Sequence, residues 1–241
     1  MDEGGGRAVN DFVDAIGFIF SERDSPAGGT RVGGLGEIWE LMWPHLKLSG
    51  ASLGIACAIA IPLGLWLGHR GRGGFLAINA SNVGRAVPSL ALIAFFMAYI
   101  GVGFTNLTLA LVLLALPPVL TNTYTGVRQV DRDAVDSARG MGMTGPQIVR
   151  RVELPLALPL IFGGIRTSAV NVVATATIAP LAGVVTLGDP IINVNTYGDE
   201  GRLAAAIVVA LLAVATEVAL GTAQRAVTPR GLKVNRREAL T

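Results

Sequence analysis

The feature that most constrains this chain is a long interval without charge. Between Arg85 and Arg128 lie 42 consecutive residues with no Asp, Glu, Lys or Arg. A helix needs ~20 predominantly apolar residues to cross a bilayer, so the interval is long enough for two spans. Soluble domains carry about 25% charged residues, whereas this chain of 241 residues has 15%. The interval predicts a polytopic membrane protein and excludes a soluble enzyme, a disulfide scaffold and a disordered chain.

The apolar stretches and the charges between them predict five spans. We place them at about residues 48–68, 81–100, 107–124, 160–185 and 203–224. We therefore expect an all-α membrane protein, a polytopic helical bundle of about five transmembrane helices, with its membrane domain at residues 48–224.

Charge asymmetry between the loops orients these spans. The loop after the first span, the loop 125–159 and the tail 225–241 are basic. The N-terminal segment 1–47 carries eight acidic and four basic residues, and the loop after the fourth span is also acidic. Basic loops stay in the cytoplasm. We expect the N-terminus outside and the basic tail in the cytoplasm.

The stretch Asp11–Phe20 is apolar but too short to span a membrane. Its apolar positions recur at helical spacing: Phe12, Ile16 and Ile19. Such a helix either lies in the membrane interface or packs on the domain, and both alternatives stay open. Trp39 and Trp43 lie on one helical face before the first span, which suits an anchor at the interface.

The loop 125–159 is too long for a simple connection and predicts two short, capped helices. Asp131 can cap the first helix, and Gly142 can end it in the left-handed conformation. Thr144 and Gln147 have the spacing of a capping box at the start of the second. The apolar residues of the first helix share one face: Ala134, Val135, Ala138 and Met141. Such a stiff element suits the transmission of force from a soluble partner; the alternative is a loop that only covers helix ends.

Within this loop the sequence resembles a known family. Asp136, Ser137 and Ala138 are followed after three residues by Gly142, and after nine more by the run 152–155, Val-Glu-Leu-Pro. Permease subunits of bacterial ABC importers carry a coupling-loop signature of this spacing: Glu-Ala-Ala, three residues, Gly, nine residues, Ile, any residue, Leu-Pro. Asp, Ser and Val replace Glu, the first Ala and Ile here, while the spacing matches throughout.

The resemblance implies a type I ABC importer permease fold and a role for the 131–155 loop. In that family the loop docks into a cleft on a separate ATPase subunit, which binds ATP and Mg. The residues expected to make this contact are Asp136, Ser137, Ala138, Arg139, Gly140, Met141, Gly142, Met143 and Thr144.

Further stretches between His45 and Arg166 resemble permeases for osmoprotectants. They are Ile61–Gly64, Val87–Ala91, Leu116–Pro118, Asn122–Gly126, Ala138–Thr144 and Gly164–Arg166. The resemblance implies import of glycine betaine, proline, carnitine or choline across the bacterial inner membrane, through a pathway of which this chain forms half. It also implies two ATPase subunits, a second permease that is identical or paralogous, an extracytoplasmic binding protein and membrane lipid as partners, and no nucleic acid.

Three alternatives accompany this reading of the loop signature. The same fold could import another small solute, such as an amino acid. A secondary transporter would need no ATPase, and the coupling-loop signature argues against it. A membrane-embedded enzyme would need a nucleophile paired with a base at depth, and the sequence shows none.

Arg166 and Glu217 are the only charges well inside the expected spans. Counting ~1.5 Å per residue from the span starts places both in the inner half of a ~30 Å core. Charges at that depth pair with one another. We expect an ion pair that holds two helices together, with a direct role in substrate binding as the alternative.

Neither a catalytic nor a metal site is expected in this sequence. Cys57 is the only cysteine, and His45 and His69, which flank the first span, are not at metal-ligand spacing. We expect the two histidines to be simple interface residues. There is no Gly-Lys-Ser/Thr phosphate loop, so ATP hydrolysis by that route requires another polypeptide.

A few polar and proline positions are candidates for transport contacts. We expect Pro88 and Asn171 to line the pathway. In the outer loop, Asn193, Asn195 and Tyr197 are expected to face a docked binding protein.

Overall fold

The computed structural model describes residues 3–72, 74–75, 79 and 87–228, with side chains from residue 10 onward. Contacts divide the chain into two compact units. The first unit comprises residues 1–52, 89–111 and 172–215, and the second comprises residues 53–88, 112–171 and 216–241.

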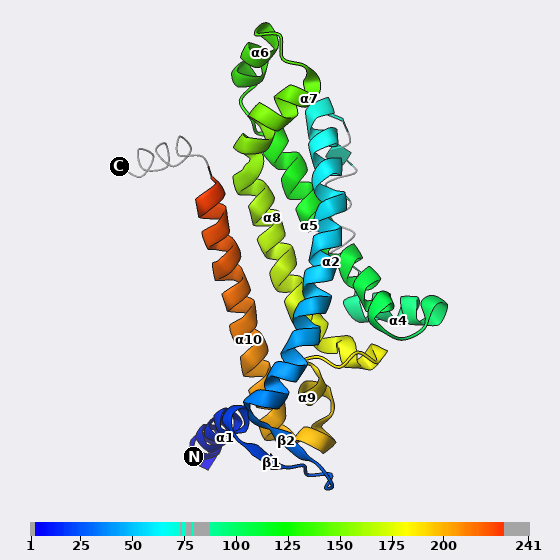
Figure 1. Cartoon of the computed structure of the whole chain (residues 1–241), viewed down its shortest axis with the longest axis vertical. Coiled ribbons are helices and arrows are strands. Elements are labelled where there is room, and N and C mark those ends of the chain that lie inside the picture. Colours follow the sequence, from blue (N-terminus) through cyan, green and yellow to red (C-terminus); the bar gives the residue numbers. More distant parts are fainter. Residues whose placement is uncertain (1–2, 73, 76–78, 80–86, 229–241) are drawn as a thin grey trace. The chain divides into compact units, whose positions relative to one another are not determined.

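Four helical runs in the described residues are long and apolar enough to cross a membrane. They are α2 (Gly34–Arg70), α5 (Phe104–Arg128), the continuous run Gly145–Ala182 and α10 (Val194–Val227), which Figure 1 colours from blue to red. Each contributes residues to both units. Apolar helices of this length satisfy their own backbone hydrogen bonds, as a bilayer requires.

The second expected span, residues 81–100, corresponds to a short described helix. α4 (Ser89–Ile100) has 12 residues, which is ~18 Å of helix against a ~30 Å hydrocarbon core. The preceding part of that expected span, residues 81–86, lies outside the described residues. The count of five spans therefore stays a prediction.

Helix ends differ from the expected span limits, and α10 (Val194–Val227) also exceeds its expected span 203–224 at both ends. α2 begins at Gly34, well before residue 48, and α5 continues to Arg128. The α-helix α8 covers Leu154–Thr175, and a 3-10 helix, η2 (Ala176–Ala182), takes over after it. Gly183, with φ +75°, ends this run in the left-handed conformation.

The first unit is built around the N-terminal elements. α1 (Glu3–Phe20) is followed by a hairpin of β1 (Glu22–Asp24) and β2 (Arg31–Gly33), whose antiparallel register pairs Arg23 with Val32. One apolar cluster joins α1 and the hairpin to α10: Ala15, Phe18, Val32, Tyr197 and Ala204. A second joins α2 to α10 through Ile38, Leu41, Leu187, Val208 and Val209.

Two residues of the first unit show how tightly it packs. His45 is fully buried and its Nε2 donates to the carbonyl oxygen of Val173 at 3.0 Å. The expectation that His45 is a simple interface residue was wrong. Near α9 (Asp189–Ile192), a Cβ on Gly188 would lie 1.7 Å from the carbonyl oxygen of Thr177, so only glycine fits there.

The second unit packs α2, α5 and α8 at very close range. A Cβ on Gly64 or Gly68 of α2 would lie 2.7 Å from Thr123 or Val127 of α5. On another face of α5, the Ser168 hydroxyl of α8 donates to the carbonyl oxygen of Ala115 at 2.8 Å. Small residues allow this approach, and close packing is what drives helix association in lipid.

Candidate functional site

The segment between α5 and α8 contains three short helical elements. They are α6 (Arg132–Gly140), α7 (Gly145–Ile148) and the π-helix η1 (Val149–Glu153). We call residues 131–153 the α6–α7 segment. In Figure 1 it lies within the second unit, at the cyan end of α2 and beside the first turns of α8.

Both ends of α6 are closed by the residues that the sequence indicates. The Asp131 carboxylate accepts a hydrogen bond from the Asp133 amide at 3.0 Å, as an N-cap does. At the other end Gly142 has φ +80°, and its amide donates to the carbonyl of Arg139. The Met143 amide donates to the carbonyl of Ala138 at 3.1 Å, which completes a Schellman motif. The predicted cap and stop of this helix are confirmed.

α7 starts where the predicted capping box places it. The Thr144 amide donates to Gln147 Oε1 at 2.8 Å, and Pro146 occupies the first turn. Proline costs no hydrogen bond at that position because the first-turn amides have no helical partner. The two short helices are therefore held at a fixed bend around Gly142.

Most of the nine expected contact residues are open to solvent. Ala138 is buried and Met143 is partly buried, while the other seven are exposed. Asp136 and Arg139 bond each other at 3.0 Å with both side chains more than half exposed. Met141 is 71% exposed, because α6 ends at Gly140 and Met141 lies beyond the apolar face. Its expected place on that face was wrong.

The far end of the α6–α7 segment is fixed by a buried carboxylate. Glu153 is 5% exposed, and its Oε2 accepts a hydrogen bond from His69 Nδ1 at 2.8 Å. His69 lies in the last turn of α2, so this bond joins the segment directly to a membrane helix. The expectation that His69 is a simple interface residue was wrong.

The residues around His69 leave room for its contact with Glu153. A Cβ on Gly145 would lie 3.2 Å from His69 Nε2, so glycine at the start of α7 leaves room for the ring. The guanidinium of Arg70, the next residue after His69, lies 4.5 Å from the centroid of the Trp66 ring one turn earlier in α2. The end of α2 thus meets the segment through the His69–Glu153 hydrogen bond and the close approach of Gly145 to the His69 ring.

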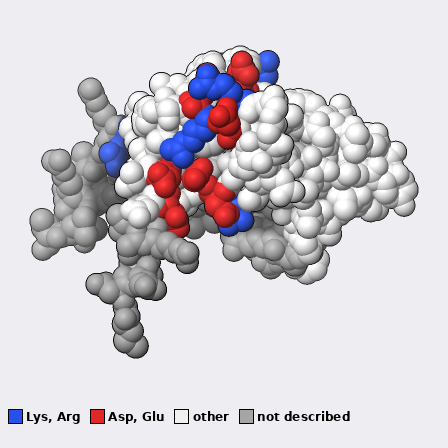
Figure 2. Space-filling view, turned by 90° about the horizontal axis from the view of Figure 1, so that it is seen from below, with Lys and Arg blue, Asp and Glu red and all other residues white. Residues whose placement is uncertain are grey.

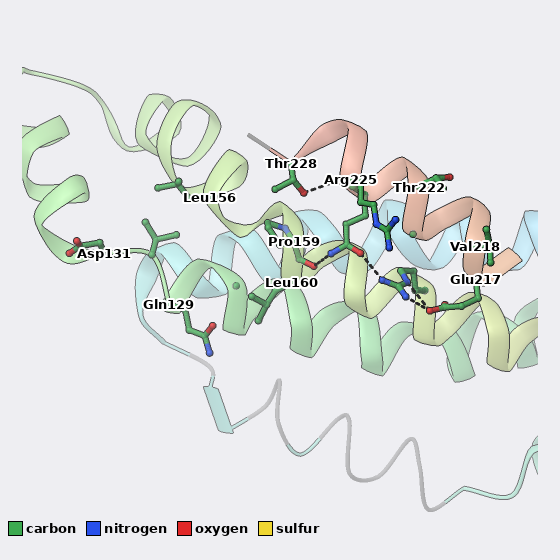
Figure 3. A pocket seen from close by; sticks show the side chains of 15 residues that line it. Gln129, Asp131, Leu156, Pro159, Leu160, Glu217, Val218, Thr222, Arg225 and Thr228 are labelled. Atoms are coloured by element: carbon green, nitrogen blue, oxygen red, sulfur yellow. Dashed lines mark hydrogen bonds and ion pairs between the residues drawn. The ribbon is translucent and has the colours of Figure 1, made fainter. Parts of the chain in front are cut away.

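A second polar network joins α8 to α10. Arg166 Nε donates to Glu217 Oε1 at 3.0 Å, and Arg166 Nη2 also contacts that oxygen. Arg166 Nη1 donates to Gln224 Oε1 at 2.8 Å, while Gln224 Nε2 donates to the carbonyl oxygen of Pro159 at 3.0 Å. The dashed lines of Figure 3 follow this path from Glu217 to Pro159. The structure therefore brings together the two charges expected to pair.

The network forms one wall of a cavity of about 900 Å³ in the second unit. The cavity is also lined by Gln129 and Asp131 at the start of the α6–α7 segment. Figure 3 shows Leu156 and Leu160 of α8 and Val218 and Thr222 of α10 around it. The ion pair thus borders a recess with a mixed polar and apolar lining, and each charge has its partner on the neighbouring helix.

The remaining candidates are scattered. Pro88 and Asn171 are exposed, and their role in lining a pathway stays a prediction. Asn193 and Asn195 are also exposed. Tyr197, however, is only 8% exposed and its hydroxyl donates to Asp189 Oδ2 at 3.2 Å. Its expected exposure to a docked protein was wrong, because it packs in the core of the first unit.

Sequence reasoning missed Glu153 and Gln224. Glu153 occupies the position of the loop signature that accepts any residue, so the motif draws no attention to it. Gln224 lies seven residues after Glu217, which is two helical turns along the same face. That spacing could have added Gln224 to the expected ion pair.

Comparison with protein families identifies the chain. Residues 60–231 match the family model "Binding-protein-dependent transport system inner membrane component". The chain belongs to this family. The match covers the α6–α7 segment and both partners of the Arg166–Glu217 pair. This inner membrane component is thus a transport permease, as the loop signature indicates.

Curated relatives cover most of this permease. The "Glycine betaine/carnitine/choline transport system permease protein OpuCB" of Bacillus subtilis is 38% identical over 199 residues, which are 82% of this chain and 92% of the relative. The "Carnitine transport permease protein OpuCB" of Listeria monocytogenes is 40% identical over 192 residues, 79% of this chain and 88% of the relative.

Solved structures support the fold. The permease aligns with "Inward facing conformations of the MetNI methionine ABC transporter" with a TM-score of 0.68 at 21% identity, over 81% of this chain and 98% of the other. At that identity the likeness shows the fold alone. The predicted ABC importer permease fold is confirmed.

The Arg166–Glu217 pair yields a charge-exchange prediction. Arg166→Gln or Glu217→Gln leaves one charge without its partner in the membrane, so we expect either to reduce the amount of assembled permease. The exchanged variant, Arg166→Glu with Glu217→Arg, should recover much of it. The measurement is the monodisperse fraction after detergent extraction.

The exposed pair Arg202–Asp199 provides the control, because surface pairs contribute little to stability. Arg202→Gln should leave the monodisperse fraction unchanged. Failure of the exchanged variant to improve on both single variants would refute the structural ion pair.

Proposed function

We propose that this chain is the membrane-spanning subunit of an ATP-driven importer for a compatible solute such as glycine betaine, proline, carnitine or choline. The relatives described above, whose names specify glycine betaine, carnitine and choline, support this substrate class. A third relative, the "Osmoprotectant import permease protein OsmY" of Salmonella typhimurium, is 38% identical over 60% of this chain. Import of another small solute through the same fold is the second candidate.

In this proposal the α6–α7 segment is the docking element for a separate ATPase subunit. The observation that carries it is the combination of an exposed, capped helix pair with a buried anchor to α2. The ATPase would bind ATP and Mg, and two copies of it would work with two permease chains, identical or paralogous. An extracytoplasmic binding protein would deliver the solute.

The geometry suggests how motion would pass through the chain. Closure of the ATPase dimer would push the exposed face around Asp136 and Met141. Because caps at Asp131, Gly142 and Thr144 resist bending, the segment would move as a unit. Its motion would reach α2 through the Glu153–His69 bond. It would reach α8 through η1, because η1 runs directly into α8. Displacement of these helices would alternate access between the two sides.

The substrate cage would lie on the binding protein. Quaternary ammonium groups are recognised by several aromatic rings held around them. In the described residues, close ring pairs occur between Phe95 and both Phe96 and Tyr99 of α4, where Phe95 and Tyr99 are exposed. Neighbours on one short helix do not surround a ligand.

We also propose that the N-terminus lies outside and the C-terminal tail in the cytoplasm, as the loop charges indicate. In a Cys57→Ala background, Asn195→Cys and Ser137→Cys place one exposed thiol on each expected side. A membrane-impermeant maleimide should label Asn195→Cys in intact cells and Ser137→Cys only after permeabilisation. The reverse pattern, or equal labelling of both, would contradict this orientation.

Two substitutions of Gly142 provide a matched test of the coupling role. No neighbouring atoms lie where a Cβ would be added at Gly142, but its φ is positive. Valine there costs about 1–2 kcal/mol of backbone strain and opens the cap, whereas asparagine tolerates the left-handed conformation. In proteoliposomes with the ATPase and binding protein, we expect Gly142→Val to lose most ATP-driven uptake of labelled glycine betaine, and Gly142→Asn to retain most of it.

Equal uptake by the two variants would contradict the coupling role of the segment. Uptake of glycine betaine should also be competed by carnitine or choline. If the complex with the unmodified permease hydrolyses ATP and imports an amino acid but not glycine betaine, the second candidate replaces the first.

A further inference from the structure

α1 buries only part of its apolar surface in the protein. Ala15 and Phe18 are buried, and Ile19 packs beside them against the first unit. A second set of apolar side chains remains exposed: Phe12 at 50%, Val13 at 61%, Ile16 at 40% and Phe20 at 67%. At ~100° per residue, these four lie on the side of the helix that adjoins the buried one. The apolar surface of α1, buried and exposed parts together, is therefore about twice as wide around the helix as the part that contacts the protein.

The opposite side of α1 is polar, and a charged side chain, that of Arg23, lies over it. Arg23 of the hairpin donates to the carbonyl oxygen of Asp14 at 3.0 Å and forms an ion pair with Glu200 at 3.3 Å. A Cβ on Gly17 would lie 2.6 Å from the Arg23 guanidinium, so glycine allows the arginine to cross the helix there. Figure 2 shows the Lys, Arg, Asp and Glu side chains gathered in a band, with uncharged surface beside it. The helix separates a charged side from an exposed apolar side.

The contacts of α1 with α10 indicate the level of α1 relative to the membrane. Its buried side packs against Ala204, with Leu203 and Ile207 beside it, and these residues begin the expected fifth span. In Figure 1, α1 is seen nearly end-on, whereas the adjacent part of α10 runs in the plane of the picture. α1 thus crosses α10 at the level where α10 would enter the bilayer. A helix in that place lies along the membrane surface and does not span it.

The start of α2 presents the same kind of surface. Leu35, Trp39 and Trp43 recur every four residues and are 59%, 61% and 52% exposed. The ammonium group of Lys47 lies 5.0 Å from the centroid of the Trp43 ring. Exposed tryptophan with a neighbouring lysine is typical of a helix at the boundary between lipid and water. The exposed apolar side of α1 and this face of α2 belong to the same unit and both fit the edge of a bilayer.

We infer that α1 is an interfacial helix whose exposed apolar side, Phe12, Val13, Ile16 and Phe20, inserts into the outer boundary of the lipid bilayer. Phe, Val and Ile carry no side-chain hydrogen-bonding groups, so they leave no polar side-chain group unsatisfied when lipid acyl chains cover them. Amphipathic helices bind the interface through an apolar side of this kind. The helix therefore anchors the hairpin and the outer end of α10 at a fixed height above the lipid.

The test compares two positions that are two residues apart and ~200° apart around the helix. In a Cys57→Ala background, Ile16→Cys and Asp14→Cys are labelled with a nitroxide in the full complex, in nanodiscs of phosphatidylcholine and phosphatidylglycerol. Collision with oxygen reports lipid, and collision with a water-soluble nickel chelate reports solvent. We expect the ratio of oxygen to nickel accessibility to be several-fold higher at position 16 than at position 14.

Phe20→Cys provides a second exposed position and should behave as Ile16→Cys does. Two results would overturn the inference. A nickel-dominated signal at positions 16 and 20 would place this side in water. Protection of both positions from both reagents would mean that a protein, such as a second permease copy or the binding protein, covers it.

Discussion

The hydrogen bond between Glu153 and His69 is the contact on which the proposed mechanism depends. A buried carboxylate is costly unless it is hydrogen-bonded, and Glu153, at 5% exposure, has this histidine as its partner. The bond fixes the last element of the α6–α7 segment to the last turn of α2. Loss of this hydrogen bond would remove a direct polar link between the segment and α2.

Close helix packing makes that anchor effective. Gly64 and Gly68 bring α2 against α5, and Gly164 brings α8 within reach of the carbonyl of Pro118. A displacement of α2 in the second unit is therefore opposed at once by backbone and side-chain atoms, because packed interiors have little free space. The Arg166, Gln224 and Pro159 network adds α10 to the same group of helices. The segment acts on a packed unit and not on a single helix.

The parts of the site that follow from neighbours in sequence could be predicted, and those that depend on distant contacts could not. The cap at Asp131, the stop at Gly142 and the start at Thr144 follow from residues three or fewer positions away. Glu153 and His69 are 84 residues apart, and only the fold shows that they meet. The predictions for His45 and Tyr197 were wrong for the same reason, since a polar side chain near a helix end gives no sign of tertiary burial.

For the membrane spans too, local sequence predicts some features and distant contacts determine others. A charge-free interval shows that helices cross the membrane, but not where they end, because an apolar helix continues while packing continues. α2 extends to Gly34 because its first turns pack through Ile38 and Leu41 on α10 and on Ile19 of α1. The pairing of Arg166 with Glu217 was predictable, because few other partners exist at that depth.

The most direct test of the central claim is the number of ATP molecules hydrolysed per solute imported by the reconstituted complex. His69→Phe keeps an aromatic ring and Glu153→Gln keeps the side-chain shape, and each removes the charge-assisted bond. We predict that each variant raises this ratio several-fold, and that the double variant is no worse than the worse single one, because the two residues act as a unit. A ratio equal to that of the unmodified protein in both single variants would contradict the account.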